Sequence, residues 1–491
     1  MFGLFLGRGW FWAAIAFLLA LHCAIDLRLM PDSRDYIEMA SHLAAGKGFV
    51  THTLDASTRV IPDVRLHHPP GYGAFLGALQ WLGLPVLAAL RLLTVLCFTG
   101  TAILVWFLIP RLAPAAHAPA AMALYLALSL LFEPWSYAMS EGPFQLLTAA
   151  TLLWLVRHPR PEPGTWALAG ALAGLATLCR WIGVSLPLAA ALWLWPRRKR
   201  KEAWFAVIAL GAGYTLVVGP WLARNALLTG RMMGKVSEPS HIPVWLNIVA
   251  FSRTLLLDLL PVLVLLLVAC AIGRRVTLSR PERFLLLWAG AYSFILLFMA
   301  SISFIDPIST RLTLPLYLAL VPFCGTHALR RLGPVRFRPA MVCLAAGLLI
   351  LTGVFQVVNA RRRAAAAPIS ATGPLSEWIA DHTPPGSLIV NPAAAPVYFP
   401  AAGERSNFVQ FFRIGGMDPA QPRAFLDRFP GRFPALFLVL PAEGPAPGAW
   451  ESAWQLTAAG EVNHPYEGQS RRWLIFQIQP RARPSSFQGI R

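Results

Sequence analysis

Acidic and basic side chains stand at the ends of long apolar segments in this chain of 491 residues. Asp32 and Asp35 follow the first apolar segment, and Glu141 begins a later one. Arginines hold comparable positions, since Arg180 ends one apolar segment and Arg311 opens another. A carboxylate can accept a proton from a hydroxyl group, and a guanidinium group can bind a phosphate through paired hydrogen bonds. At one face of a membrane, such a combination points to chemistry on a lipid headgroup.

The composition predicts a polytopic α-helical membrane protein. Hydrophobic residues make up 56% of the chain and charged residues only 13%, and the mean hydropathy is +0.56. Soluble domains carry about a quarter charged residues. The net charge of +19 would suggest a nucleic-acid partner in a soluble chain, but much of it lies in short loops between apolar segments, so we expect membrane lipids as partners and no nucleic acid.

Apolar segments predict about 11 transmembrane helices, several of them short for a bilayer that needs about 20 residues. They fall at about 10–30, 85–109, 118–133, 141–156, 165–180, 181–195, 203–222, 254–272, 284–301, 311–329 and 340–358. No cleavage site of small residues follows the first segment, so we expect an uncleaved anchor. The six cysteines all lie in or beside apolar segments and indicate neither a disulfide framework nor a zinc motif.

The composition changes near residue 365, where the chain becomes Pro-rich and contains the strand-like runs "SLIV", "ALFLVL" and "RWLIFQI". We therefore predict a C-terminal soluble α/β domain after the membrane module. The predicted organisation is a membrane module at 1–360, with interfacial helices in a first outer loop at 31–84, a soluble domain at 365–480 and a disordered tail at 481–491.

Lys and Arg concentrate in alternate short loops, such as "RRKRK" at 197–201. The positive-inside rule then places the N-terminus inside and the C-terminal domain on the outer side of the membrane. Polar residues at span ends share that outer side in this orientation: Asp32, Asp35, Glu133, Glu141, Arg180, Arg224, Asp306 and Arg311. Charges within spans are few, namely Arg91 and, near the outer end of the eighth span, Asp258. A transporter would place more of its ionisable groups near the midplane.

Six segments resemble, in order, those of the GT-C glycosyltransferases, close to the protein mannosyltransferase and lipid A aminoarabinose transferase group. They are "DSRDYIEMASHLAAGKGF" at 32–49, "HHPPGYGAFLGAL" at 67–79, "MSEGPFQLL" at 139–147, "TLCRWIG" at 177–183, "GPWLARNALLTG" at 219–230 and "STRLTLPLYL" at 309–318. The segment "PLSEWIADHTPPGSLIV" also resembles the start of this family's outer domain. Each motif is loose, but the ordered set is specific.

The resemblance implies an inverting transfer of a sugar from a polyprenyl phosphate, usually undecaprenyl phosphate in bacteria, to a lipid, glycan or protein acceptor. It implies a location in the bacterial inner membrane, with the active site and the C-terminal domain on the periplasmic side. Asp32 occupies the family's general-base position. Arg311 and Arg180 are the candidates for stabilising the phosphate leaving group, with His68 or Arg224 assisting.

The sequence departs from the family pattern in two places. The family often has Asp-Glu at the base position, whereas this chain has Asp32 followed by Ser33. The aminoarabinose transferases have a Lys before the proline pair, where this chain has His67 and His68. A histidine is a weaker permanent cation than a lysine, so phosphate binding would depend more on the arginines.

Each candidate residue also has a structural explanation beside the functional one. Asp32 could simply cap a helix at about 33–45, and Asp35 could be the base, a first-turn charge or a partner for a nearby arginine. Glu141 also suits the start of a helix, and the outer arginines could anchor spans at the headgroups. The aromatic side chains near these motifs are candidates for packing or for sugar contact: Tyr36 and Trp221.

Two other classes stay open, namely a transporter or flippase of lipid-linked sugars, and a ligase or polymerase of surface glycans. No inverted repeat or pair of interrupted spans favours the transporter. We expect no cofactor and independence from metals. The alternative, taken from oligosaccharyltransferase relatives, is a divalent cation between Asp32 and Glu141.

Overall fold

The computed structural model describes most of the helical region and the core of the C-terminal region. The described residues are 2–25, 27, 31–50, 68–112, 114, 117–131, 135, 138–233, 242–272, 277–302, 308–332, 374–384, 387–391, 409–412, 434–442, 448–451, 454–466 and 469–480. The chain divides into two compact units. The first comprises 1–30 with 65–358, and the second comprises 31–64 with 359–491.

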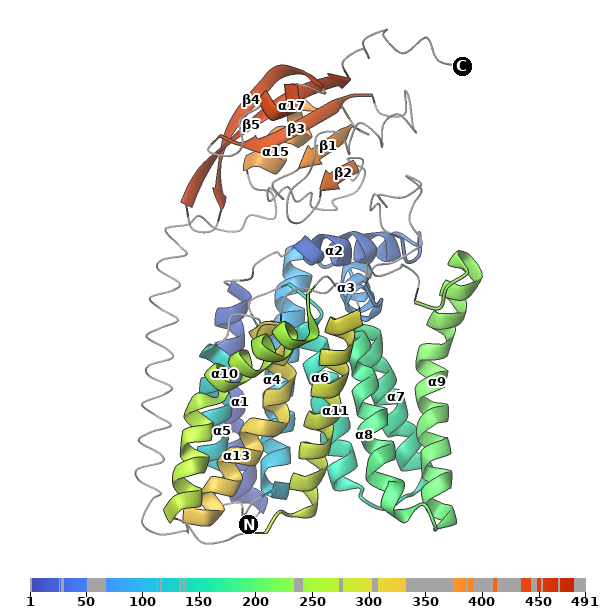
Figure 1. The fold of residues 1–491 in the computed structure, drawn as a ribbon, viewed down its shortest axis with the longest axis vertical. Helices are drawn as coiled ribbons and strands as arrows, with labels where there is room; N and C mark the ends of the chain where they lie inside the picture. Colours follow the sequence, from blue (N-terminus) through green and yellow to red (C-terminus); the bar gives the residue numbers. More distant parts are fainter. Residues whose placement is uncertain are drawn as a thin grey trace. The chain divides into compact units, whose positions relative to one another are not determined.

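The first unit is a bundle of helices, several of which run side by side in Figure 1. Its α-helices are α1 (Phe2–Ile25), α3 (Gly71–Trp81), α4 (Val86–Leu112), α5 (Ala118–Leu131), α6 (Glu141–Arg157), α7 (Pro163–Cys179), α8 (Ser185–Leu194), α9 (Lys201–Thr229), α10 (Val244–Ile272), α11 (Arg280–Ile302), α12 (Thr310–Thr313) and α13 (Tyr317–Leu332). Short 3-10 turns precede α8 at Trp181–Val184 and join α12 to α13 at Leu314–Leu316.

Ten of the predicted apolar segments coincide with helical segments of the bundle, and the segment at 340–358 lies outside the described residues. Four helices of the described chain are long and apolar enough to cross a membrane by themselves: Val86–Leu112, Lys201–Thr229, Arg280–Ile302 and Thr310–Arg331. Counting the bent pair Val244–Leu260 and Val262–Ala271 as one span gives five. The chain therefore has the character of a polytopic membrane protein, while the number of about 11 spans stays a prediction.

Helices α7 and α9 approach each other so closely that their contact needs glycine. A Cβ atom on Gly170 would collide with the carbonyl oxygen of Leu210, and one on Gly213 would collide with that of Ala167. Gly174 faces the side chain of Val217 in the same contact. Small residues spaced four apart let two membrane helices bring their backbones together, where van der Waals packing holds them.

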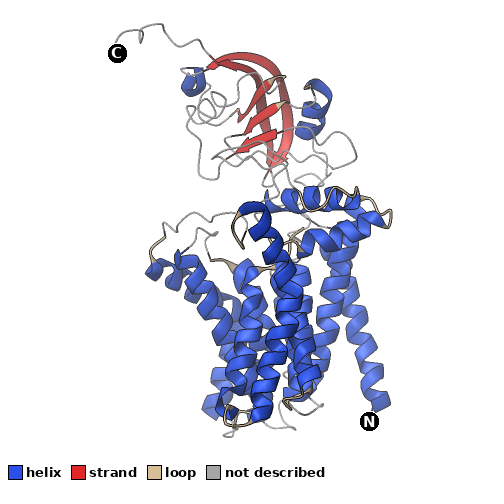
Figure 2. Cartoon of the chain, turned by 90° about the vertical axis from the view of Figure 1, so that its right-hand side faces the viewer, coloured by secondary structure: helices blue, strands red, loops and turns tan. Residues whose placement is uncertain are grey.

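The second unit contains a mixed five-stranded sheet and short helices (Figure 2). The strand order is β2-β1-β3-β5-β4; β1 pairs parallel with β2 and β3, and β5 pairs antiparallel with β3 and β4. The elements are α2 (Pro31–Ala44), α15 (Pro374–His382), β1 (Leu388–Asn391), β2 (Val409–Phe412), β3 (Leu436–Pro441), α17 (Gly448–Glu451), β4 (Trp454–Tyr466) and β5 (Gln469–Pro480).

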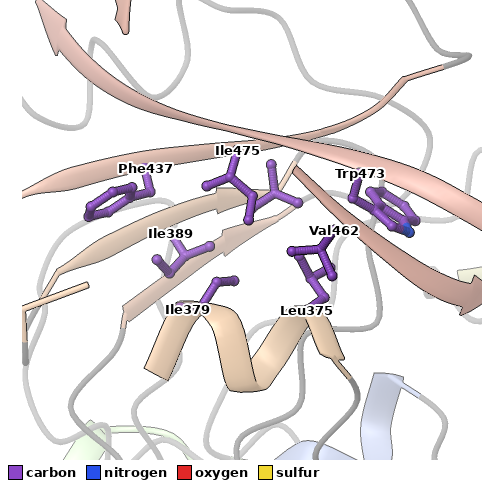
Figure 3. Packing of buried hydrophobic residues seen from close by; sticks show 8 residues of the cluster. Leu375, Ile379, Ile389, Phe437, Val462, Trp473 and Ile475 are labelled. Carbon is purple, nitrogen blue, oxygen red and sulfur yellow. The ribbon is translucent and has the colours of Figure 1, made fainter. Parts of the chain in front are cut away.

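Two apolar clusters form the core of this α/β region, one on each face of the sheet. Leu375 and Ile379 of α15 pack against Ile389 of β1 and Ile475 of β5 (Figure 3). The second cluster lies on the other face of the sheet. There Trp450 of α17 packs with residues of the strands: Leu388, Val390, Leu438, Leu440, Trp454 and Ile478. Because β1, β3 and β5 contain the three strand-like runs, that part of the prediction is confirmed. The domain limits and the outer location of this region stay predictions, and the tail at 481–491 lies outside the described residues.

The contact between α7 and α9 can be tested with two substitutions in one helix. Gly213→Ala should lower the stability of the protein by about 1–3 kcal/mol, because the added methyl group must push two backbones apart. Beyond its chain neighbours and the backbone of its own helix, a methyl group added at Gly211 would meet no atom within 4 Å. Gly211→Ala should therefore be neutral or stabilise the helix by up to about 1 kcal/mol. Thermal melting of both variants in detergent gives the comparison, and equal melting temperatures would contradict the close contact.

Candidate active site

Glu141 begins α6, where the aligned peptide dipoles favour a negative charge. Its side chain is only 3% exposed. Gly142 lets this helix start close to α4, because a Cβ atom at Gly142 would lie 3.3 Å from the Cβ atom of Cys97. The segment "MSEGP" therefore places a carboxylate in the interior of the bundle.

Arg180 lies at the break between α7 and the 3-10 turn that follows it. Its backbone is extended (φ −150°, ψ 129°), and its N–H still donates to the carbonyl oxygen of Ala176 at the end of α7. Gly183 makes the tight reversal possible, since a Cβ atom there would lie 2.6 Å from the backbone nitrogen of Thr177. Gly71 packs against the same turn, with a Cβ position 2.7 Å from the carbonyl oxygen of Leu178. Two glycines of the sequence motifs thus shape the turn that presents Arg180.

Arg311 lies in α12, the short helix that precedes α13. Ser309 is extended at its N-terminus, and its carbonyl oxygen accepts hydrogen bonds from the N–H groups of Leu312 and Thr313. In the helical segment Thr310–Arg331, 94% of the most apolar 18-residue stretch is buried inside the protein. Arg311 therefore sits at one end of a helix that runs through the interior of the bundle.

The three side chains form one cluster. Oε1 of Glu141 forms an ion pair with Nη1 of Arg180 and another, at 2.8 Å, with Nε of Arg311. Neither contact has the alignment of a hydrogen bond, so the attraction is between charges. Nη1 of Arg180 also donates to Oγ of Ser140 at 3.5 Å, and Nη1 of Arg311 lies 3.6 Å from Sδ of Met139. The sequence-predicted residues Glu141, Arg180 and Arg311 are therefore neighbours in space.

The cluster carries one positive charge in excess, because two guanidinium groups share one carboxylate. The side chains of Arg180 and Arg311 are 16% and 17% exposed, whereas that of Glu141 is 3% exposed. The arginines thus keep accessible surface while the acid lies behind them. A guanidinium group has five N–H donors, so such a pair can bind a phosphate while the carboxylate holds the arginines close together.

Two residues outside the sequence motifs hold the helix that carries Arg311. Asp258 of α10 accepts hydrogen bonds from the hydroxyls of Thr310 at 3.3 Å and Thr313 at 3.4 Å. Tyr292 of α11 donates from its hydroxyl to the carbonyl oxygen of Leu312 at 2.8 Å. The only sequence signal for this support is Asp258, as a rare charge inside an apolar segment. Thr310 and Thr313 flank the arginine, but their partners lie more than 50 residues away.

A small pocket borders the cluster, beside Met139 and Gly142. Its walls come from the motif segments at 67–79 and 139–147, from α4, and from Trp135: Tyr72, Leu93, Thr94, Cys97, Trp135, Met139, Gly142 and Pro143. An apolar and aromatic wall next to a cationic cluster suits a ligand with a charged group and an apolar or ring-shaped part.

Arg224 is placed differently from the other two arginines of the motifs. Its guanidinium carbon lies 4.6 Å above the ring of Trp221, and its Nη1 donates to Oδ1 of Asn225 at 3.1 Å. Asn225 in turn donates to the carbonyl oxygen of Met232, and Gly230 ends the helix in the left-handed conformation (φ +72°). These contacts describe the C-terminal end of α9 and give Trp221 a packing role. No described contact joins Arg224 to Glu141.

The remaining candidates begin in the segment 31–84, which was predicted to be the first outer loop. Asp32 and Asp35 are half-buried and Tyr36 is buried on α2, in the second unit. Helix α2 starts at Pro31, so Asp32 is the second residue of its first turn, and the prediction that Asp32 caps a helix at about 33–45 is wrong. His68 is half-buried, just before α3, and His67 lies outside the described residues, as do Glu133 and Asp306. Within the part of the chain that is described, no three His, Cys, Asp or Glu side chains are grouped as metal ligands would be.

Comparison with known proteins matches part of the chain to one family. The family model of the dolichyl-phosphate-mannose-protein mannosyltransferases matches residues 67–223. These residues contain Glu141 and Arg180 but end before Arg311. No curated protein matched the chain.

The fold is similar to that of solved structures of ArnT and AftD. ArnT from Cupriavidus metallidurans bound to undecaprenyl phosphate matches with a TM-score of 0.61 and 13% identity, over 96% of this chain and 98% of that chain. The apo structure of ArnT matches over the same shares with a TM-score of 0.61 and 14% identity. The arabinofuranosyltransferase AftD from Mycobacteria matches over 95% of this chain and 41% of that one, with a TM-score of 0.52 and 15% identity. The chain therefore has the fold of these solved proteins.

The ion cluster predicts a measurable effect of Glu141 on stability. Glu141→Gln would leave two neighbouring guanidinium groups without their shared counter-ion, and should lower the free energy of unfolding by about 2–3 kcal/mol. The matched control is Glu162→Gln, since Glu162 is exposed at the start of α7 and should change stability by less than about 0.5 kcal/mol. Thermal melting in the same detergent compares them. If both variants melt together with the unmodified protein, the cluster does not hold these helix ends.

Proposed function

We propose that this protein is an inverting glycosyltransferase that moves a sugar from a polyprenyl phosphate, such as undecaprenyl phosphate, to an acceptor at the outer face of the membrane. The observation that carries the proposal is the convergence of Arg180 and Arg311 on Glu141, with one positive charge in excess. The fold shared with ArnT, a protein solved with undecaprenyl phosphate, supports the same assignment.

The arginine pair suits the leaving group of this reaction. When the bond between the anomeric carbon and the phosphate oxygen breaks, negative charge grows on the phosphate. Donors already in place where charge develops stabilise a transition state without reorganisation. Glu141 contributes by neutralising part of the repulsion between the arginines and by fixing their positions. In this proposal Arg180 and Arg311 bind the phosphate, and Glu141 orients them.

The acceptor needs a base on the other side of the sugar, because inversion requires attack opposite the leaving group. We assign this role to Asp32, which takes the proton of the acceptor hydroxyl as its oxygen bonds to the anomeric carbon. Polyprenyl phosphate then departs with the electron pair of the broken bond. Asp35 is the alternative base. We assign further contacts to the donor to three residues of the segment 31–84 and one of α9: Tyr36, His67, His68 and Arg224.

The acceptor class stays open within this proposal and comprises a lipid, a glycan or a protein. The proposed location is the inner membrane of a bacterium, with the site and the C-terminal α/β region on the periplasmic side. The support is the distribution of Lys and Arg among the short loops. A flippase of lipid-linked sugars is the alternative, in which Asp32 would have no chemical role.

Replacing the proposed base separates the transferase from the flippase. Asp32→Asn should lower the rate of sugar transfer by about 10²–10⁴-fold, because general-base catalysis contributes on that scale, while binding of the lipid donor is retained. The measurement is transfer from a radiolabelled polyprenyl-phosphate sugar to an extract of lipids, glycans and proteins. Asp381→Asn is the control, since Asp381 is exposed on α15.

Asp35→Asn belongs in the same assay. A loss of transfer in Asp35→Asn but not in Asp32→Asn would move the base role to Asp35. Full transfer by both variants would overturn the proposed mechanism, and movement of the lipid donor across a vesicle membrane by both variants would favour the flippase.

Metal dependence is tested by chelation. We expect transfer to continue in excess EDTA, because the proposed phosphate site is built from guanidinium groups and needs no bridging cation. Loss of activity in EDTA that returns with Mn²⁺ would instead favour a divalent ion held by outer carboxylates such as Glu141.

A further inference from the structure

A second cavity lies at the other end of α6 from Glu141. Its lining includes Leu155 and Val156, 14 and 15 positions along the helix from Glu141, which at about 1.5 Å per residue corresponds to roughly 21 Å along the axis. The cavity has a volume of about 110 Å³, and its walls come from four helices and one loop: Leu155, Val156, Pro159, Trp166, Trp193, Arg280, Pro281 and Phe284. This site is separate from the cluster at the start of α6.

The walls are apolar and firmly held. The indole N–H of Trp166 donates to the carbonyl oxygen of Arg160 at 2.8 Å, so the ring has no unsatisfied donor in the cavity. Trp193 packs edge-on against Phe284, with ring centroids 5.6 Å apart. Leu155, Trp166 and Phe284 are buried. Such walls offer contacts to hydrocarbon and almost none to a polar molecule.

Arg280 is the exception among the lining residues. Its guanidinium carbon lies 5.7 Å from the centroid of the Trp193 ring, and its Nη2 atom is buried without a hydrogen-bond partner among the described residues. A buried donor without an acceptor is costly, so this group favours a ligand that supplies one. A phosphate oxygen is the acceptor that a guanidinium group binds best.

The acid nearest in sequence to Arg280 is already engaged elsewhere. Oε2 of Glu282 accepts from the backbone N–H of Ser279 at 2.6 Å and pairs with Nη1 of Arg330 at 2.8 Å, while Oε1 lies 3.3 Å from Nδ1 of His327. Glu282 is thus engaged by other groups, and no described residue accepts a hydrogen bond from Nη2 of Arg280. Further arginines lie close in sequence to the lining residues, at Arg157, Arg160 and Arg283, and they add to the positive character of this end of the bundle.

We infer that this cavity binds an anionic glycerophospholipid, with its phosphate on Arg280 and the start of an acyl chain against Trp166, Trp193 and Phe284. The apolar walls exclude a small soluble anion as the preferred ligand, and the positive charge of the half-buried Arg280 disfavours a lipid without a net negative charge. In the orientation predicted from the loops, this end of the bundle faces the inner leaflet, where anionic headgroups gather near basic residues. The inference does not depend on the proposed sugar transfer.

The test is native mass spectrometry of the full-length protein, purified in detergent and titrated with phosphatidylglycerol. Arg280→Gln should weaken binding of the first lipid about tenfold, the scale of one charge-assisted hydrogen bond. Arg283→Gln is the matched control. Arg283 is three residues away and exposed, and it does not line the cavity, so its loss removes the same charge and should leave binding unchanged.

A second variant keeps the charge and removes the space. Val156→Trp fills the cavity and should weaken the first binding event to a similar degree, even if Arg280→Gln proves unstable. Equal binding by the unmodified protein, Arg280→Gln and Val156→Trp would overturn the inference, as would an equal loss in Arg283→Gln. Competition by glycerol 3-phosphate at equal concentration, or equal binding of phosphatidylcholine, would also overturn it, because the site would then not select an anionic lipid.

Discussion

The attraction between the Glu141 carboxylate and the guanidinium groups of Arg180 and Arg311 joins three parts of the chain at one place. Glu141 starts α6, Arg180 stands at the break after α7, and Arg311 lies in the short helix before α13. Charges in an apolar bundle need partners. The acid therefore constrains where all three helix ends lie.

Such a cluster is poor evidence for stability alone. Buried ion pairs can often be replaced by apolar side chains without loss, because the attraction only offsets the cost of removing charges from water. A cluster with two cations and one anion is less suited still to a purely structural role. The excess charge, the accessible surface of the arginines and the neighbouring pocket fit the proposed binding of an anion. The supports from Asp258 and Tyr292 fit this view, because they hold the helix that carries Arg311 through contacts separate from the ion pair.

The sequence was informative where a local pattern decides the structure. Apolar length predicted ten described helical segments, and the runs around Ile389, Leu438 and Ile475 predicted three strands of the sheet. The membrane topology predicted from Lys and Arg in the loops placed Glu141, Arg180 and Arg311 on one side of the bundle. The number of spans was harder to predict, because α5, α7 and α8 are shorter than a bilayer requires and their hydropathy does not show whether each crosses it alone.

Contacts between distant segments left no local signal. Gly71 and Gly183 read as turn residues in the sequence, but their importance lies in the backbone that they touch near Thr177 and Leu178. Asp258 was visible as an unusual charge, yet its threonine partners were not. Arg224 stood beside a motif like the other arginines, and the structure gives it a tryptophan and an asparagine of its own helix as neighbours. Residue type and spacing predicted which chemical groups the site could contain. Tertiary packing decided which of those residues lie next to one another.

The most direct test is the affinity of the protein for undecaprenyl phosphate itself, without any sugar or acceptor. Native mass spectrometry of the unmodified protein, Arg311→Gln and the exposed control Arg198→Gln gives this quantity. If the arginine pair binds the lipid phosphate, Arg311→Gln should bind at least about tenfold more weakly, and Arg198→Gln should bind as the unmodified protein does. Equal affinity in all three proteins would contradict the claim that Arg180 and Arg311 form the phosphate site.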